Sequence, residues 1–158
     1  MVDADLYSIF RMRSEEASVV YLQAYKFSDI EDAKTWIIKM KLSVENNHSI
    51  YWVIADVVTN EMLGSISLWN FQLENFIGEA GYGLLAENFG KGIMSEALKA
   101  VTEYGFKQLQ LKSIEAFTRF DNAASINLLL KNGFVLIKDR KDDDVPENII
   151  FVLSNPYL

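Results

Sequence analysis

The stretch ENFGKGIMSEALKAVTEYGF, residues 87–106, decides how the middle of this chain folds. Two glycines, Gly90 and Gly92, bracket a lysine, and a helix-forming run follows from Ile93. Glycine frees the backbone to bend and leaves amide N–H groups uncovered at the start of a helix. Such a helix start carries partial positive charge and unpaired donors. The stretch therefore suits an anion.

The residues on either side of the two glycines predict a strand–loop–helix unit. Residues 76–85 have the pattern of a β-strand, and residues 93–109 have the pattern of a helix. A strand that leads through a glycine-rich loop into a helix is a phosphate-binding geometry. The loop is neither a Walker loop, which has a four-residue spacer before Gly-Lys-Ser/Thr, nor a three-glycine dinucleotide fingerprint. Taken alone, it fits a structural turn as well as a phosphate site.

The rest of the chain alternates helical and strand patterns without a repeat or a linker, which predicts one domain over residues 1–158. Ser28-Asp29-Ile30-Glu31 has the form of a capping box, and Asn132-Gly133 has the form of a helix C-cap. The acidic loop DRKDDDVPEN, residues 139–148, is interpreted as a solvated tip rather than a metal site. Further helices are expected at residues 3–13, 15–25, 28–44 and 122–131, and further strands at residues 50–58, 62–69, 113–118, 135–138 and 149–153.

Composition excludes several classes of site. The 158 residues include no cysteine and one histidine, His48. Disulfides, thiolate metal sites and a cysteine acyl-enzyme are therefore ruled out, and His48 alone makes neither a metal site nor a triad. The lack of a membrane-length apolar run or a signal-peptide layout predicts a cytoplasmic protein that binds no membrane. The net charge of −7 disfavours nucleic acid and suits either a cationic substrate or solubility alone.

A second segment, DNAASINLLLKNGF at residues 121–134, gives the glycine loop a context. Together the two segments resemble the GNAT acetyltransferase superfamily, and most of all its branch of ribosomal-protein N-terminal acetyltransferases. The resemblance covers residues 61–158 well and the earlier helices loosely. It implies a single α+β domain with a mixed, mostly antiparallel sheet flanked by helices, and acetyl transfer from acetyl-CoA to a primary amine. The matching residues are GYGL at 81–84, FGKGIMSEAL at 89–98, Asn122, Ser125 and Gly133-Phe134.

The resemblance also implies where acetyl-CoA binds. The pyrophosphate is expected on the backbone amides of residues 90–95, with added charge from Lys91. The pantetheine arm is expected on backbone groups of Leu84 and Leu85 and on the side chain of Asn122. The expected binding residues are therefore Leu84, Leu85, Gly90, Lys91, Gly92, Ile93, Met94, Ser95 and Asn122.

Three residues depart from the family pattern. Phe89 stands where Gln or Arg is usual, and Met94 stands where Gly or Ala is commoner, so that its side chain would crowd the loop. Leu129 occupies the position of the tyrosine that many members use as a general acid, and leucine cannot donate a proton. Ser125, on the same helix, is the substitute that the resemblance suggests.

The resemblance names two candidate catalytic residues. Glu79 matches a glutamate of the family's strand and is the candidate base, acting through water, while Ser125 is the candidate proton donor. With no cysteine in the chain, direct attack of the amine on bound acetyl-CoA is simpler than an acyl-enzyme route, and no metal is expected. A structural role stays open for both residues: an exposed strand carboxylate for Glu79 and a helix cap for Ser125.

Several alternatives remain open at this stage. The acceptor is a protein N-terminus, a polyamine or another small amine, and it is expected to be cationic. A CoA-binding sensor without activity and a nucleotide-phosphate-binding protein are the alternative functions. The family's usual first strand is not seen, because residues 8–13 are expected to be helical, although a strand there is the alternative. A missing strand would leave a sheet edge at residues 50–58, which a homodimer could cover.

Overall fold

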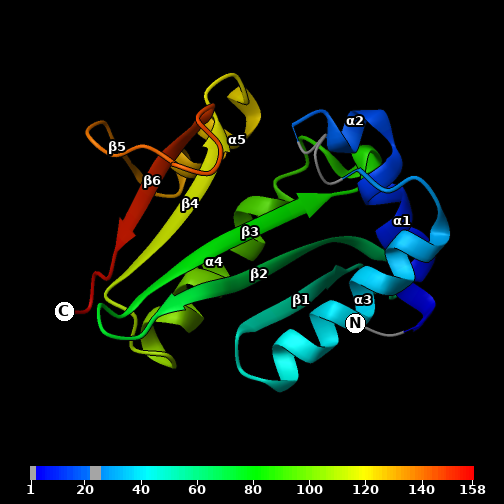
Figure 1. Cartoon of the computed structure of the whole chain (residues 1–158), viewed down its shortest axis with the longest axis horizontal. Helices are drawn as coiled ribbons and strands as arrows, with labels where there is room; N and C mark the ends of the chain where they lie inside the picture. The colour runs from blue at the N-terminus through cyan, green and yellow to red at the C-terminus, as the bar shows by residue number, and fades with distance from the viewer. Residues whose placement is uncertain (1–2, 22–25) are drawn as a thin grey trace. The chain divides into compact units, whose positions relative to one another are not determined.

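The computed structural model describes residues 3–21 and 26–158 (Figure 1). The strands form one six-stranded sheet in the order β1-β2-β3-β4-β6-β5. β3 pairs with β4 in parallel, and β6 pairs with both β4 and β5 in antiparallel fashion. This mixed sheet with helices confirms the α+β fold expected from the sequence. The elements are η1 Asp3–Asp5, α1 Leu6–Ser14, α2 Glu16–Val19, α3 Ile30–Glu45, β1 Ser49–Ala55, β2 Met62–Gln72, β3 Ile77–Leu84, η3 Ala86–Asn88, α4 Ile93–Lys107, β4 Ser113–Arg119, α5 Ala123–Lys131, β5 Val135–Ile137 and β6 Asn148–Ser154.

The N-terminal helices agree with the prediction in part. Residues 8–13 lie inside α1, so the helical prediction for them is confirmed and the strand alternative is wrong. The helix expected at residues 15–25 is represented by the short α2, and residues 22–25 lie outside the described part of the chain.

The capping box of α3 is displaced by one residue from its predicted place. Asp29, rather than Ser28, is the N-cap, and its carboxylate accepts from the N–H groups of Glu31 at 2.9 Å and Asp32 at 3.2 Å. The Asp32 carboxylate in turn accepts from the N–H groups of Ser28 at 2.7 Å and Asp29 at 3.4 Å. Serine and aspartate are about equally good N-cap residues, so residue type alone does not decide between Ser28 and Asp29.

β1 ends three residues earlier than predicted because a polar turn begins there. The carboxylate of Asp56 accepts from the N–H groups of Val58 at 2.8 Å and Thr59 at 2.9 Å, which bends the backbone directly after Ala55. The turn lies at residues 57–59. Asn60 follows with a φ of 60°, a conformation that asparagine tolerates.

The chain forms two compact units. The first unit consists of Met1–Ser67 and Tyr82–Met94, and the second unit of Leu68–Gly81 and Ser95–Leu158. β2 and β3 each run through both units. No helix within residues 3–21 or 26–158 is long and apolar enough to cross a membrane.

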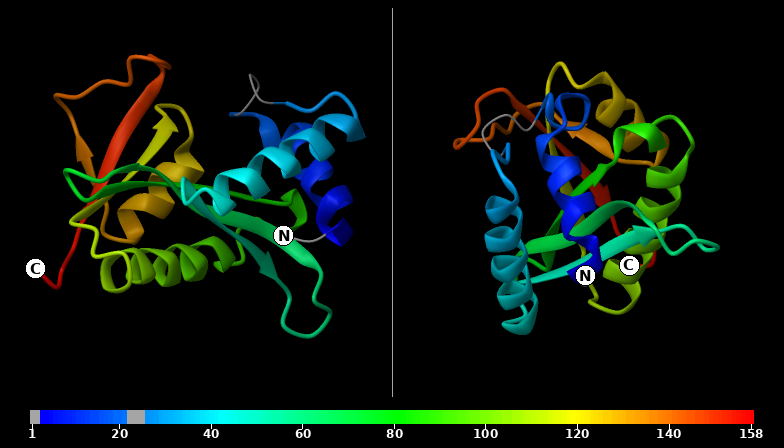
Figure 2. Two further views of the ribbon diagram at one scale, coloured as in Figure 1. Left: turned by 60° about the horizontal axis from the view of Figure 1, so that its bottom comes forward. Right: turned by 90° about the vertical axis from the view of Figure 1, so that its right-hand side faces the viewer.

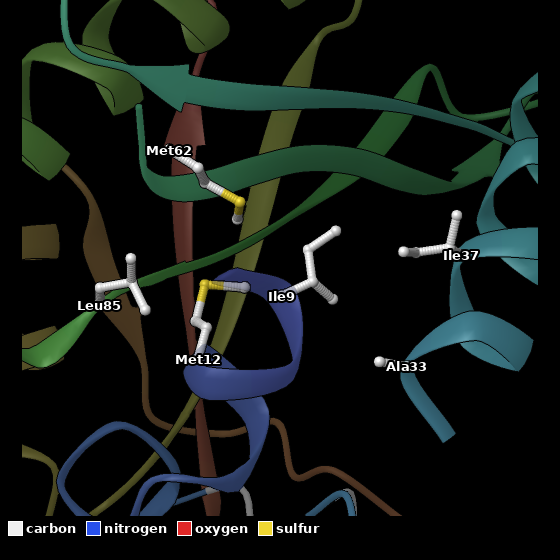
Figure 3. Packing of buried hydrophobic residues seen from close by; sticks show 6 residues of the cluster. All are labelled: Ile9, Met12, Ala33, Ile37, Met62 and Leu85. Atoms are coloured by element: carbon white, nitrogen blue, oxygen red, sulfur yellow. The ribbon is translucent and has the colours of Figure 1, made fainter. Parts of the chain in front are cut away.

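The core of the first unit lies where α1 and α3 pack on each other and α3 packs on β1 (Figures 1 and 2). Ile9 and Ala33 are completely buried. Figure 3 shows how the side chains of this core gather around Ile9 from the two helices, from β2 and from Leu85, the residue that follows β3. The cluster consists of Ile9, Met12, Ala33, Ile37, Met62 and Leu85.

In the second unit, α4 packs closely on one face of the sheet (Figure 2). A Cβ atom at Gly105 would lie 2.9 Å from the end of the Ile114 side chain and 3.2 Å from the end of that of Leu68, so any larger residue there would require these side chains to shift. β6 lies between β4 and β5 and pairs with β4 along its whole length, from Ser113↔Ser154 to Arg119↔Asn148 (Figure 1). The final hairpin predicted from the sequence, β5 with β6, is confirmed.

Candidate functional site

The glycine loop has the backbone that an anion site needs. Gly90 has a φ of 74° and Gly92 a φ of 81°, a left-handed conformation that favours glycine, and α4 begins directly afterwards at Ile93. Both glycines are exposed, and a Cβ atom at either would meet nothing within 4 Å. A loop of this kind before a helix start presents open N–H groups to a phosphate. The residues present therefore fit the pyrophosphate expected there.

The turn before the loop is fastened within the first unit. Asn88 is 6% exposed, and its Nδ2 donates to the carbonyl of Leu63 at 3.2 Å. Its Oδ1 accepts from Nζ of Lys91 at 3.4 Å, which holds the lysine ammonium at the loop. The guanidinium of Arg11 donates to both carboxylate oxygens of Glu87, at 2.9 and 3.2 Å. These contacts tie η3 to α1 and β2, so the loop starts from a fixed point.

Met94 and Ser95 lie in the first turn of α4, where Met94 is buried and Ser95 has a hydrogen-bond partner. Met94 is 7% exposed, so its side chain turns into the protein and the expected crowding of the loop is not found. In the second unit, the Ser95 hydroxyl donates to Oδ1 of Asn132 at 3.2 Å and accepts from its Nδ2 at 3.0 Å. Because Asn132 is the C-cap residue of α5, this contact joins the start of α4 to the end of α5. The role expected of Ser95 therefore rests on its backbone N–H.

The backbone of Leu85 is engaged within the first unit. Its N–H donates to the carbonyl of Leu63 at 3.0 Å, and its carbonyl accepts from the N–H of Asn88 at 2.9 Å. A carbonyl oxygen has a second lone pair, so one acceptor position on Leu85 remains for a ligand. Contacts of Leu84 and Leu85 with a pantetheine arm stay a prediction.

Glu79 lies in the second unit on β3, opposite Glu115 of β4. The pairing of the two strands covers Ile77, Gly78 and Glu79. Because Ile114 faces α4 and side chains alternate along a strand, Glu79 and Glu115 both stand on the sheet face turned away from α4. Nδ2 of Asn70 donates to the carboxylate of Glu79 at 3.2 Å. Asn70 has a φ of 49°, which interrupts the regular alternation of β2 at that point.

The surroundings of Glu79 raise the pKa of its carboxyl from 4.5 to about 7. Burial is the main cause, and the negative charges of Glu115 and Asp142 add to it. The hydrogen bond from Asn70 and the positive charge of Arg140 oppose the increase in pKa. A carboxyl group with this pKa both accepts and releases a proton near neutral pH. This pKa is compatible with the expected role of Glu79 as a base, which stays a prediction.

Glu115 is the most deeply buried acidic residue of this face, at 4% exposed. Its two carboxylate oxygens each accept from the guanidinium of Arg140, at 2.5 Å. This contact holds the pKa of Arg140 above its usual value. Within the described ranges, no three His, Cys, Asp or Glu residues are grouped so as to hold a metal ion.

Comparison with known proteins identifies the family. The sequence model described as Acetyltransferase (GNAT) domain matches residues 1–135. The chain belongs to the GNAT acetyltransferase family. It is therefore an acyltransferase of a family that uses acetyl-CoA.

One GNAT relative is the Bacillus subtilis (strain 168) protein named "Uncharacterized N-acetyltransferase YoaA", which is 31% identical over 85% of this chain and 76% of its own length. The structure of the ribosomal-protein-S5-alanine acetyltransferase from Vibrio fischeri has a TM-score of 0.76 at 24% identity, covering 99% of this chain and 91% of that one. The spermidine N-acetyltransferase from Vibrio cholerae, in complex with CoA and spermine, has a TM-score of 0.80 at 16% identity, covering 98% and 92%. At these identities the two structures show a shared fold.

Helix α5 carries the remaining GNAT positions. Asn122 is its N-cap, and the Asn122 Oδ1 accepts from the N–H of Ser125 at 3.1 Å. Leu129 is completely buried, so the position of the usual tyrosine is part of the core here. The proposed contact of Asn122 with the coenzyme and the proton-donor role of Ser125 stay predictions.

Sequence reasoning missed three residues that shape the surroundings of Glu79: Asn70, Glu115 and Arg140. The sequence does indicate that Glu115 is buried, because Glu115 is the one charged residue in the strand sequence SIEAF and has apolar residues on both sides. A buried charge requires a partner, so the position of Glu115 predicts a pairing with an arginine or a lysine. The sequence does not indicate which arginine or lysine this is.

Proposed function

We propose that residues 1–158 form one N-acetyltransferase domain that transfers the acetyl group of acetyl-CoA to a cationic primary amine by direct attack. The observation that carries this proposal is the half-buried carboxyl of Glu79 with a pKa of about 7. The glycine loop with its open N–H groups supports the coenzyme part of the proposal.

Glu79 is proposed to take a proton from the acceptor, through water. A primary ammonium has no lone pair, so it must lose a proton before its nitrogen forms a bond with the acetyl carbon. An ordinary glutamate is a poor acceptor for that proton. Raising the pKa of Glu79 from 4.5 to about 7 makes the transfer more favourable by about 3 kcal/mol, at about 1.4 kcal/mol per pH unit. The buried position of Glu79 thus suits it to this step.

The remaining groups hold the coenzyme and complete the proton balance. Bound acetyl-CoA supplies the acetyl group as a thioester, whose C–S bond breaks as the new N–C bond forms. The backbone N–H groups of residues 90–95 and the ammonium of Lys91 are proposed to hold the pyrophosphate. Leu84, Leu85 and Asn122 are proposed to hold the arm, and Ser125 to pass a proton to the departing thiolate while its hydroxyl takes up the second proton that the nitrogen loses as the amide forms.

The acceptor is proposed to be cationic. The chain carries a net charge of −7 although acetyl-CoA is itself an anion, so the overall charge works against the coenzyme and in favour of a positive second substrate. The similarity to a spermidine N-acetyltransferase and to a ribosomal-protein acetyltransferase supports an amine of this kind. A protein N-terminus, a polyamine and another small amine are the candidates.

The test is turnover of Glu79→Gln with a panel of amines. Glutamine keeps the shape of the side chain and the contact with Asn70 but cannot take up the proton, so kcat/KM is expected to fall roughly 10²-fold or more near neutral pH. Coenzyme binding, measured by calorimetry, should change little. Wild-type rates for Glu79→Gln at every pH would assign Glu79 a structural role, and a wild-type protein that binds CoA but acetylates no amine would favour the inactive sensor.

A further inference from the structure

Glu115, which is buried, and Arg140, whose side chain is 45% exposed, form an ion pair on the sheet face of Glu79. We propose that Glu115 and Arg140 are positioning residues that fix the charge state of Glu79 and thereby set the pH range in which the enzyme works. The proposal rests on the proposed function of Glu79 as the base. It adds that Arg140 offsets part of the negative charge that Glu115 and Asp142 place beside Glu79.

The pair is built into the second unit with good geometry. The Glu115 side chain is 5% exposed, and both of its oxygens accept from Arg140 at 2.5 Å. The guanidinium also lies 5.9 Å from the ring centre of Phe117, two residues further along the same face of β4. Two-point contacts of arginine with a carboxylate are the strongest of the side-chain ion pairs. The position of the positive charge is therefore well defined.

The loop that carries Arg140 is held at its other end. Oδ1 of Asp142 accepts from the N–H groups of Asp144 at 3.0 Å and Val145 at 3.2 Å. Its Oδ2 accepts from Nδ2 of Asn148, the first residue of β6, at 2.8 Å. Asp142 thus departs from the solvated tip expected from the sequence, because its side chain accepts on both oxygens, whereas Asp143 and Asp144 are exposed as expected. Arg140 projects from a folded loop rather than from a free one.

Glu79 faces charged or polar groups from every neighbouring element of the second unit. Asn70 comes from β2, Glu115 from β4, and Arg140 and Asp142 from the loop between β5 and β6. Since facing residues of paired parallel strands lie close together, Glu115 is the nearest acidic neighbour along the sheet. Without a cation beside it, Glu115 would repel a charge on Glu79. Arg140, which pairs with Glu115, offsets part of that repulsion.

This arrangement predicts opposite effects for the two members of the pair. Arg140→Gln leaves Glu79 beside an uncompensated carboxylate, so Glu79 should hold its proton to a higher pH. Glu115→Gln leaves Glu79 beside an uncompensated guanidinium, so Glu79 should lose its proton at a lower pH. The double variant removes both charges and should return Glu79 close to wild type. A merely structural role for the pair gives no reason for effects of opposite sign.

The test measures the charge of Glu79 in two independent ways. Carbon-13 NMR of labelled glutamate, with the Glu79 signal assigned from Glu79→Gln, reports the pKa of Glu79 directly. The acid limb of the plot of kcat/KM against pH reports the pKa of the essential base of the free enzyme. We expect an upward change of about one pH unit or more in Arg140→Gln and a downward one in Glu115→Gln. Arg140→Lys should largely restore the wild-type profile. Arg119→Gln, which removes an arginine of β4 paired with Asp121, is the matched control and should leave both readings unchanged.

The outcomes separate this inference from the proposed function. Opposite changes in the two single variants, both seen by NMR and followed by the acid limb, support it. Changes seen by NMR without any change in the acid limb also support control of Glu79 by the pair, but they would remove Glu79 from its role as base. Changes of the same sign, or none, overturn the inference. Should Arg140→Gln fail to fold because Glu115 is left buried and unpaired, Glu115→Gln decides alone: an unchanged pKa of Glu79 rejects the proposal.

Discussion

Because the Glu79 carboxyl is partly buried, its ionisation should lower the free energy of unfolding. Glu79→Gln, which cannot ionise, should therefore stabilise the protein at alkaline pH. The pKa of the carboxyl is 4.5 when it is unperturbed and about 7 in the folded chain. Because the folded state binds this proton more tightly than the unfolded state, stability falls as the pH rises from about 4.5 to about 7. Below that range both states are protonated and nothing is lost. Above it, the loss reaches about 3 kcal/mol at most, at about 1.4 kcal/mol per pH unit.

Urea unfolding of wild type and Glu79→Gln over this pH range tests the magnitude. The two free energies of unfolding should be similar near pH 4.5 and should diverge to as much as about 3 kcal/mol near pH 8. For a chain of this length each kcal/mol corresponds to roughly 2–4 °C in Tm. Glutamine can still accept from Asn70, so the variant keeps the 3.2 Å contact. Glu74→Gln, at an exposed position in the turn before β3, is the control and should stay within about 0.5 kcal/mol.

One result would refute this reasoning. If Glu79→Gln is no more stable than wild type near pH 8, the charged carboxylate is well solvated in the folded chain. The pKa of Glu79 would then be close to 4.5, and Glu79 would be a poor base at neutral pH.

Three further predictions concern the coenzyme, the acceptor and the assembly. Gly92→Asp places a negative charge in the loop, and calorimetry should show that acetyl-CoA binding is weakened by several kcal/mol. The control is Gly92→Ala, whose Cβ meets no neighbour. It should cost about 1 kcal/mol of stability, because alanine is strained at the positive φ of residue 92. Equal coenzyme affinity in a folded Gly92→Asp would rule the loop out. If the acceptor is cationic, kcat/KM should fall with added salt, because attraction between exposed charges is screened over about 10 Å at 0.1 M; a salt-independent rate would speak against it. β1 forms an edge of the sheet, so we expect two copies to cover it, and light scattering that shows a monomer at every concentration would contradict this.

Local signals explain why much of the fold was predictable. The helix of residues 123–131 begins at an asparagine whose side chain caps it, and it is followed by Gly133 with a φ of 85°. Both signals act within a few residues of the backbone that they shape, so the sequence displays them directly. The same holds for the two glycines of the loop. The capping box of α3 was off by one residue because Ser28 and Asp29 are both good N-caps, and only the fold decides between them.

The surroundings of Glu79 were not predictable in the same way. Glu115 and Arg140 are separated by 25 residues, a helix and a hairpin strand, and nothing local connects them. Asn70 reaches Glu79 only because its backbone leaves the regular strand conformation. Sequence reasoning could name Glu79 through a family resemblance, but its pKa depends on contacts that exist only after the sheet has formed. The sequence thus predicts Glu79 as a candidate residue, but it does not predict the raised pKa of its carboxyl.

The central place of β6 has a consequence for how the protein is made. A growing chain folds from its N-terminus, and β4 and β5 both leave the ribosome before β6. Since β6 pairs with each of them, both strands expose an unpaired edge until Asn148–Ser154 has been synthesised. Asn148 also holds the loop that contains Arg140, through its hydrogen bond to Asp142. Until Asn148 has been synthesised, the Glu115 carboxylate therefore lacks the fixed position of its partner Arg140. A ribosome that stalls before this point would release a chain that has its glycine loop but leaves the edges of β4 and β5 unpaired, and such chains are expected to aggregate in the cell.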